Sequence, residues 1–257
     1  MHRADRPGSE RSFDALVEEA ASAPIDGWDF GWLEGRASEE RPPWGYAGLV
    51  AERARGVAAM LDLQTGGGEL LAGLPALPSL LVATEAHVPN VAVADRRLRP
   101  RGAHVVHARD EALPFGDGRF ELVTSRHPVA TAWGEVARVL RRGGTYLSQQ
   151  VGPDSVGELS AWLLGPVPPS TARRPERVRA AAQEAGLVVD HLRTARLRTV
   201  FDDVGAVVYF LRLVVWIVPG FDVERFRPRL VALHHCIADE GPFVAHATRM
   251  LIEAHKP

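Results

Sequence analysis

Short apolar runs alternate with helix-like segments along the middle of the chain. The runs that have the composition of buried strands are residues 57–63, 79–85, 103–108, 120–126 and 145–151. Strands that alternate with helices form parallel βαβ units. Parallel strands are buried on both faces, which explains why these runs are not polar at every second residue. The pattern predicts an α/β fold with an open, doubly wound sheet.

Three consecutive glycines follow the first of these strands, in the stretch DLQTGGGE at 62–69. In open α/β sheets a ligand binds beyond the carboxyl ends of the strands, and glycines let it approach the backbone closely. The stretch lacks the Gly-Lys-Ser/Thr of a P-loop. A dinucleotide fingerprint would need a glycine where Leu71 stands. Nucleoside triphosphates and NAD are therefore disfavoured as ligands.

Three further motifs follow the glycine-rich turn. Glu85 ends the second strand, and a carboxylate about 20 residues after such a turn can accept hydrogen bonds from ribose hydroxyls. The polar stretch ARDEALPFGDGRFELV follows the third strand. The stretch EVARVLRRGG precedes the fifth.

In this order and spacing, the four motifs resemble class I S-adenosylmethionine-dependent methyltransferases of the type 11 kind, over about residues 57–150. The family's acid-x-G-x-G-x-G motif matches Asp62, Gly66 and Gly68, with Gln64 in place of the first glycine. Its ribose acid matches Glu85. The "LPF" and "E-x-x-R-V-L" motifs match at 113–115 and 135–140.

The resemblance implies the fold and the cofactor. It implies a seven-stranded sheet of order 3-2-1-4-5-7-6 with strand 7 antiparallel. It also implies a helical N-terminal lid at 1–56, an S-adenosylmethionine-binding core at 57–150, and substrate-side helices with closing antiparallel strands at 151–257. The residues that we expect to bind S-adenosylmethionine are Asp62, Thr65, Gly66, Gly67, Gly68, Glu85, Ala86, Arg109, Asp110, Glu111, Ser125, Arg126, Trp44 and Tyr46.

Two positions depart from the family pattern. Gln64 stands where a glycine is usual, so we expect its φ to be negative, in a right-handed or extended conformation. Arg109 stands where the family places an adenine-contacting Asp. Either Asp110 takes that role or backbone groups hold the adenine amine.

Candidates for the acceptor side follow the fourth and fifth strands. His127 is a candidate general base or substrate contact, the alternative being a loop histidine that shapes the pocket. Gln149 and Gln150 are expected to contact substrate, or else to form an ordinary strand end. Tyr209 and Trp216 lie in an apolar stretch that either lines a substrate pocket or packs in a core or dimer face. Trp44 and Tyr46 either close on the cofactor or pack the lid onto the sheet.

Composition limits the remaining functions. The net charge of -2 gives no general case for nucleic acid. Cys236 is the only cysteine, so no intrachain disulfide and no Cys-based zinc site can form, and we expect no metal. The first 20 residues lack a signal-peptide core, and the apolar run at 207–218 is interrupted by Arg212 and too short for a bilayer. These features predict a cytoplasmic protein without a membrane partner.

The sequence therefore predicts S-adenosylmethionine-dependent methyl transfer to a small molecule, in bacterial specialised metabolism. The alternatives are an RNA base methyltransferase and a non-catalytic cofactor-binding protein. A homodimer is left open.

Overall fold

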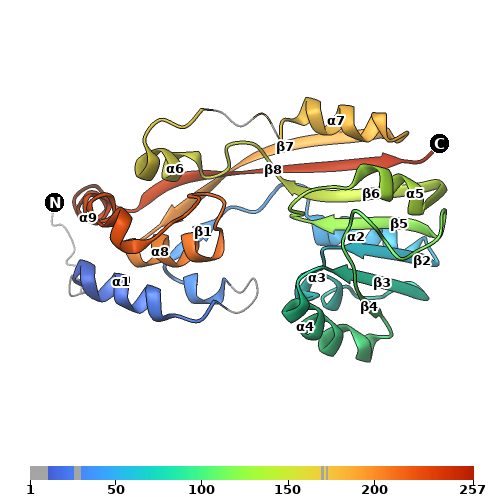
Figure 1. Cartoon of the computed structure of the whole chain (residues 1–257), viewed down its shortest axis with the longest axis horizontal. Helices are drawn as coiled ribbons and strands as arrows, with labels where there is room; N and C mark the ends of the chain where they lie inside the picture. The colour runs from blue at the N-terminus through green and yellow to red at the C-terminus, as the bar shows by residue number, and fades with distance from the viewer. Residues whose placement is uncertain (1–10, 26–29, 169–170, 172) are drawn as a thin grey trace, which may run out of the picture. The chain divides into compact units, whose positions relative to one another are not determined.

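The computed structural model describes residues 11–25, 30–168, 171 and 173–257. Within them, one mixed sheet has the strand order β1-β7-β8-β6-β5-β2-β3-β4 (Figure 1). The strands are β1 (Ala37–Glu39), β2 (Ala59–Leu63), β3 (Leu80–Glu85), β4 (His104–His107), β5 (Phe120–Arg126), β6 (Leu140–Val151), β7 (Val188–Phe201) and β8 (Phe243–His255). The α-helices are α1 (Phe13–Ser22), α2 (Tyr46–Arg55), α3 (Glu69–Ala72), α4 (Val88–Leu98), α5 (Trp133–Val139), α6 (Gly157–Leu164), α7 (Pro175–Glu184), α8 (Val204–Leu213) and α9 (Val223–Glu240).

The strand order confirms the predicted topology and adds one strand to it. Strands β2, β3, β4, β5 and β6 pair in parallel, and β8 pairs antiparallel with β6. If β2 is numbered 1 and the later strands are numbered in chain order up to β8 as 7, the order is 3-2-1-4-5-7-6. Strand β1 is added at the edge, beside β7. The prediction of seven strands was therefore wrong by one: β1, expected inside the helical lid, pairs antiparallel with β7. Three residues are too few to show a strand periodicity, so only the tertiary pairing reveals β1.

The chain divides into two compact units. The sheet unit comprises the described parts of residues 41–155, 168–197 and 247–257, and the helical unit those of 1–40, 156–167 and 198–246. Both units are discontinuous in sequence, unlike the predicted segments 1–56, 57–150 and 151–257, which stay predictions. Residues 1–10 and 26–29 of the predicted lid lie outside the described residues.

In the sheet unit, apolar side chains pack on both faces of the parallel strands. One face carries Leu61, Leu63, Val123 and Tyr146 against side chains of α5 and α7. The other carries Met60, Leu122 and Leu147 against α2, α3 and α4. This two-sided burial is the reason why the strand runs are apolar throughout rather than alternating.

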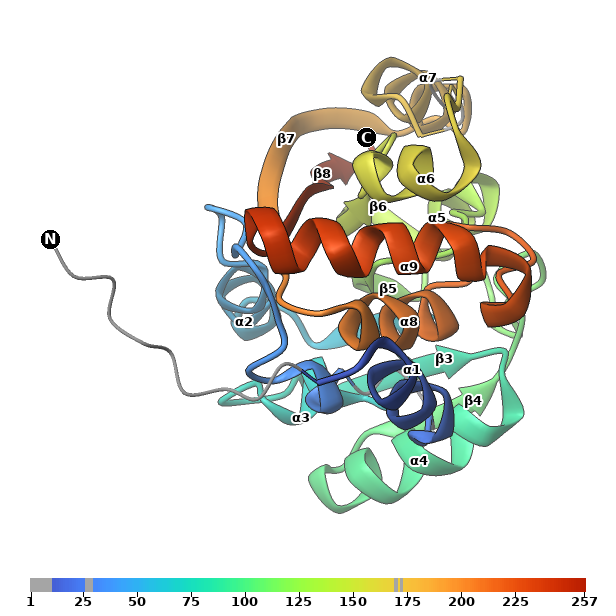
Figure 2. The ribbon, with the colours of Figure 1, turned by 90° about the vertical axis from the view of Figure 1, so that its left-hand side faces the viewer.

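The helical unit packs α1 and α9 beside α8 (Figure 2). Asp203 begins α8 by accepting a hydrogen bond from the Ala206 N–H at 2.8 Å, and most of the helix is buried. Within the apolar stretch at 207–218, α8 ends at Leu213. The residues that follow are rich in β-branched and aromatic side chains, which favour the helix less. No helix among the described residues has both the length and the apolarity that a membrane crossing requires.

Arg138 connects α5 to the loop that precedes β5. Its guanidinium donates to both carboxylate oxygens of Glu135 at 2.6 and 2.7 Å, and to the carbonyls of Phe115 and Leu113 at 2.6 and 3.1 Å. It also pairs with Asp117 at 2.9 Å. These carboxylates raise the Arg138 pKa, the Glu135 hydrogen bond being the largest cause. Arg138 thus satisfies carbonyls that secondary structure leaves unpaired.

We expect Arg138→Ala to lower the free energy of unfolding by about 2 kcal/mol, because several charge-assisted hydrogen bonds are lost. Urea denaturation measures the change. Arg141→Ala is the matched control: Arg141 pairs with Glu121 at 2.7 Å from a mostly exposed position. It should cost less than about 1 kcal/mol. Equal losses in the two variants would show that the network adds nothing beyond a surface ion pair.

Candidate functional site

The candidate site lies where β2, β3, β4 and β5 end, within the sheet unit. Leu63 of β2 is in register with Ser125 of β5, and Glu85 of β3 with His107 of β4. The strands are parallel, so their carboxyl ends meet at one edge of the sheet. Most of the predicted cofactor-binding residues follow these ends, and the structure brings them together.

The glycine-rich turn depends on backbone that only glycine adopts readily. Gly66 and Gly68 have φ of 61° and 78°, in the left-handed region. A Cβ on Gly68 would also lie 2.8 Å from Leu98 Cδ1, so glycine is required there for packing. The turn is tied to β3 by the Thr65 N–H, which donates to the Thr84 carbonyl at 2.9 Å.

Glu85 joins the glycine-rich turn to the end of β3. Its carboxylate accepts from the Gly66 N–H at 2.9 Å and from the His87 N–H at 2.8 Å, and the residue is only 8% exposed. A carboxylate has about four lone-pair positions, so acceptor capacity remains for hydroxyl groups. The contact of Glu85 with ribose stays a prediction.

Asp62 is buried at the end of β2. Its carboxylate accepts from Thr124 Oγ1 at 2.6 Å. Burial raises the Asp62 pKa to about 6, and the hydrogen bond from Thr124 opposes the shift. The Thr65 hydroxyl is close enough to lower the pKa further, yet Thr65 Oγ1 is buried without a partner of hydrogen-bond geometry.

The expectation of a negative φ at Gln64 was wrong: its φ is 51°. A left-handed conformation costs a non-glycine residue about 1–2 kcal/mol. Three hydrogen bonds of the side-chain amide offset this cost. Gln64 Nε2 donates to Asp110 Oδ2 and, at 2.8 Å, to the Ala130 carbonyl. Gln64 Oε1 accepts from the Val129 N–H at 2.7 Å. The tertiary contacts therefore decide the backbone conformation.

Asp110 and Arg109 differ in their surroundings. Arg109 is exposed, whereas Asp110 is half-buried and contacts Gln64. Burial raises the Asp110 pKa, the Gln64 hydrogen bond lowers it, and the charges of Glu111 and Glu85 raise it. Asp110 is thus the better placed of the two for the predicted adenine contact, which stays a prediction.

Trp44 and Tyr46 pack against the ends of β5 and β6. Trp44 Nε1 donates to Gln149 Oε1 at 2.7 Å, and the Tyr46 hydroxyl lies 2.8 Å from the Ser125 carbonyl and 3.1 Å from the Leu147 carbonyl. Both aromatic residues are buried, at 7% and 5% exposure. They close this edge of the sheet, and their contact with the cofactor stays a prediction.

His127 follows β5 in a left-handed conformation, with φ of 55°. Its Nε2 lies 3.0 Å from Gln149 Nε2. Gln149 Oε1 accepts from Trp44, so the Gln149 nitrogen faces His127 and donates, which places the imidazole proton on Nδ1. Burial lowers the His127 pKa to about 3, and the positive charges of Arg249 and Arg126 add to the shift. His127 is therefore neutral at physiological pH.

The other predicted residues lie in three settings. Ser125 is buried in a hydroxyl network: its Oγ lies 2.8 Å from the Tyr146 hydroxyl and 2.8 Å from Ser148 Oγ. Gln150 Nε2 donates to Thr131 Oγ1 at 3.1 Å. Exposed residues at the strand ends are Ala86, Glu111 and Arg126. In the helical unit lie Tyr209, whose hydroxyl donates to the Pro24 carbonyl at 3.1 Å, and Trp216, which is 40% exposed. Their contact with substrate stays a prediction.

Three residues of the site were missed by the sequence analysis. Thr124 pairs with Asp62, Tyr146 pairs with Ser125, and the Arg193 guanidinium lies 5.8 Å from the Trp44 ring centroid. Strand alternation could have indicated Thr124, since it lies one residue before Ser125 and faces the other side of β5. Nothing in the sequence connects Arg193 to Trp44.

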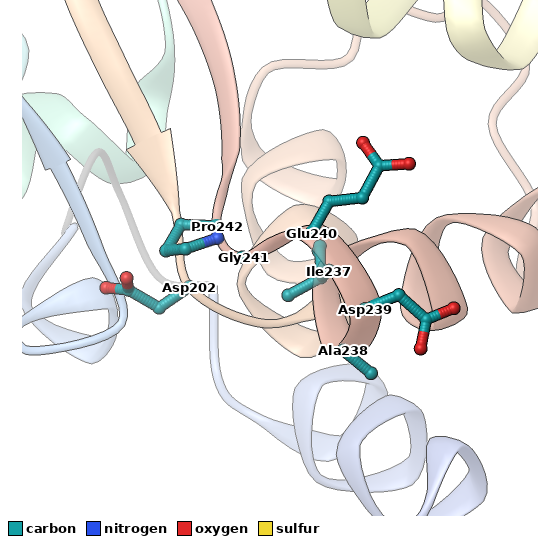
Figure 3. A pocket seen from close by; sticks show the side chains of 7 residues that line it. All are labelled: Asp202, Ile237, Ala238, Asp239, Glu240, Gly241 and Pro242. Carbon is teal, nitrogen blue, oxygen red and sulfur yellow. The ribbon is translucent and has the colours of Figure 1, made fainter. Parts of the chain in front are cut away.

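A hollow of about 360 Å³ lies in the helical unit at the end of α9. The carboxylates of Asp202, Asp239 and Glu240 around it point away from one another (Figure 3). Across the described residues, no three His, Cys, Asp or Glu side chains gather as metal ligands would. This hollow has no converging groups that could hold a ligand.

The strand-end residues fit S-adenosylmethionine in most respects. The glycine-rich turn and the spare acceptor positions of Glu85 suit a ligand with ribose hydroxyls and an amino-acid end. Gln64 and Arg109 depart from the family pattern: the Gln64 side chain connects three loops, and Arg109 is exposed.

Comparison with known proteins supports the same assignment. Residues 61–148 match the family model described as methyltransferase domain. No curated protein matches the sequence at a significant level.

Solved structures share the fold. A proposed methyltransferase from Bacillus halodurans is 19% identical, with a TM-score of 0.61 over 83% of this chain and 99% of that one. The cyclase SpnF is 18% identical, with a TM-score of 0.51 over 94% and 92%. Geranyl diphosphate methyltransferase, solved in complex with S-adenosylmethionine, is 12% identical, with a TM-score of 0.50 over 82% and 84%. These identities are low enough that the likeness concerns the fold alone.

The lowered His127 pKa predicts a loss of stability in acid. The folded protein keeps His127 neutral down to about pH 3, whereas the unfolded chain protonates near the ordinary value of about 6.5, so acid favours unfolding between these values. Between pH 6.5 and 5, protonation of His127 in the unfolded chain lowers the free energy of unfolding by about 2 kcal/mol, at about 1.4 kcal/mol per unit. The pKa of Asp62 is raised in the folded protein, so acid protonates the folded form first. Between about pH 6 and 4, acid therefore raises the stability contributed by Asp62.

Urea denaturation at several pH values should therefore give a smaller acid loss for His127→Asn than for the original protein, since Asn also accepts a left-handed backbone. His104→Asn, at an exposed position of β4, is the control and should leave the pH dependence unchanged. Parallel pH curves for the original protein and His127→Asn would contradict the assignment.

Proposed function

Residues 61–148 form a class I methyltransferase domain whose cofactor is S-adenosylmethionine, and from this we propose that the protein methylates a small-molecule acceptor at the ends of β5 and β6. The observation that supports the proposal is the contact of Glu85 with the Gly66 N–H beside the left-handed glycine-rich turn. This hydrogen bond joins Glu85, the predicted ribose-binding acid, to the glycine-rich turn.

The residues at the cofactor end bind and orient. Glu85 would accept from the ribose hydroxyls, and the N–H groups of the turn from Gly66 to Gly68 would approach the amino-acid end, where no side chain intervenes. Bound there, S-adenosylmethionine supplies an electrophilic methyl group. The protein mainly needs to align an acceptor atom with it, which can contribute about 7–11 kcal/mol.

The residues at the ends of β5 and β6 favour a methyl acceptor that needs no strong base. A histidine with a pKa of about 3 is a poor proton acceptor near pH 7, so we assign His127 to shaping the site and contacting substrate rather than to general base catalysis. Arg126 is exposed next to it and, together with Arg249, adds positive charge. An acceptor with an acidic hydroxyl, thiol or carboxyl group suits these surroundings, because positive charge stabilises its anion.

The wider setting that we propose is bacterial specialised metabolism. The support for it is an analogy: geranyl diphosphate methyltransferase, which shares the fold at low identity, is named for a small-molecule substrate. The acidic balance of the whole chain, with a net charge of -2, favours a small acceptor over RNA.

Calorimetric titration with S-adenosylhomocysteine, the product form of the cofactor, tests the proposal. We expect binding to the original protein and binding at least about tenfold weaker for Glu85→Gln, because an ionised acceptor makes the stronger hydrogen bonds to hydroxyls. Gln keeps one oxygen for the Gly66 N–H, while its NH₂ group replaces the oxygen that accepts from the His87 N–H.

Glu69→Gln is the matched control, since Glu69 is exposed beside the same turn and pairs with Arg97. It should bind like the original protein. The absence of any binding heat for the folded original protein would remove the proposed function. Equal affinities for the original protein and Glu85→Gln would remove Glu85 from the site.

A further inference from the structure

Gln64 connects three loops that leave neighbouring strands. Its amide nitrogen donates to Asp110, beyond β4, and to the Ala130 carbonyl, beyond β5. Its amide oxygen accepts from the Val129 N–H at 2.7 Å. We call Gln64 with these three partners the Gln64 bridge.

The bridge crosses the line along which a ligand would lie. In the sheet order β5-β2-β3-β4, Gln64 leaves β2 while its partners leave β5 on one side and β4 on the other. A molecule held by both Glu85 and the glycine-rich turn would extend over the same strand ends. The bridge and such a molecule therefore compete for space and for the Asp110 carboxylate.

We propose that the Gln64 bridge must open before S-adenosylmethionine binds, so that Gln64 limits the affinity and selectivity of the cofactor site. This inference rests on the proposed function. When a binding-competent state is populated only in part, the measured affinity falls by that fraction. Three hydrogen bonds keep the bridge closed, and a cofactor must replace them.

The conformation of Gln64 supports a role beyond packing. Among the described non-glycine residues, a left-handed φ occurs at Gln64, His127, Asp154 and Val156. Gln64 and His127 leave the adjacent strands β2 and β5 at the candidate site. A conformation this rare persists only where the surroundings require it, and such residues cluster at functional sites.

Replacing Gln64 with glycine separates the two roles that the bridge could have. Gly accepts the same left-handed backbone and removes the amide, so the turn keeps its shape while the crossing side chain is lost. If the bridge obstructs the cofactor, affinity rises. If the bridge instead prepares the loops for binding, affinity falls.

We expect calorimetric titration to give at least about tenfold tighter S-adenosylhomocysteine binding for Gln64→Gly than for the original protein. Asp154→Gly is the matched control, because it also replaces a left-handed residue, at φ of 52°, without touching the bridge. It should bind like the original protein. Unchanged or weaker binding by Gln64→Gly would overturn the inference and leave the proposed function standing. If neither protein binds, the proposed function fails and the inference fails with it.

The side-chain NH₂ resonances of Gln64 give a second readout, identified by their loss in Gln64→Gly. In the original protein they report the bonds to Asp110 and Ala130. Saturating S-adenosylhomocysteine should shift them and speed their exchange with water. Resonances that stay unchanged in the saturated complex would show that the bridge remains closed and would overturn the inference.

Discussion

The parallel pairing of β2 with β3 on one side and β5 on the other determines the rest of the site. Leu63 is aligned with Ser125, and Asp62 with Ala83, so the glycine-rich turn leaves β2 beside the end of β5 and next to Glu85. In a doubly wound sheet this is the place where the strand order reverses and helices depart to both faces, which leaves an opening at the strand ends. A one-residue shift of β2 would turn Asp62 to the opposite face, and a one-residue shift of β5 would do the same to Thr124 and Ser125.

Buried polar groups at this edge are paired almost completely with one another. Asp62 with Thr124, Ser125 with Tyr146 and Ser148, and Trp44 with Gln149 and His127 form short networks. Because burial disfavours charge, the His127 pKa is lowered and the Asp62 pKa raised. The edge thus holds a neutral His127 and a buried Asp62 carboxyl within hydrogen-bonded networks, while the charged side chain of Arg126 lies exposed beside them.

Residues whose role depends on local backbone were predictable from the sequence. Gly66 and Gly68 in the turn and the acid Glu85 at the end of its strand belong to motifs that act over a few residues. Residues whose role depends on distant partners were not. The φ of Gln64 was predicted wrongly because its value is maintained by contacts with residues 46, 65 and 66 positions away. The pairing of β1 with β7 likewise joins segments more than 150 residues apart.

The sequence alone determined the strand-and-helix alternation, the class of fold and the glycine-rich turn, because hydrophobic period and turn chemistry are local properties. The order of the seven main strands followed only from the resemblance of the motifs to a known family. Only the tertiary structure decided that Gln64 bridges three loops, that His127 is neutral with its proton on Nδ1, and that Trp44 reaches Gln149. Each of these depends on how far apart in space two side chains come to lie and on how much water remains around them, and neither quantity is encoded in the spacing of residues along the chain.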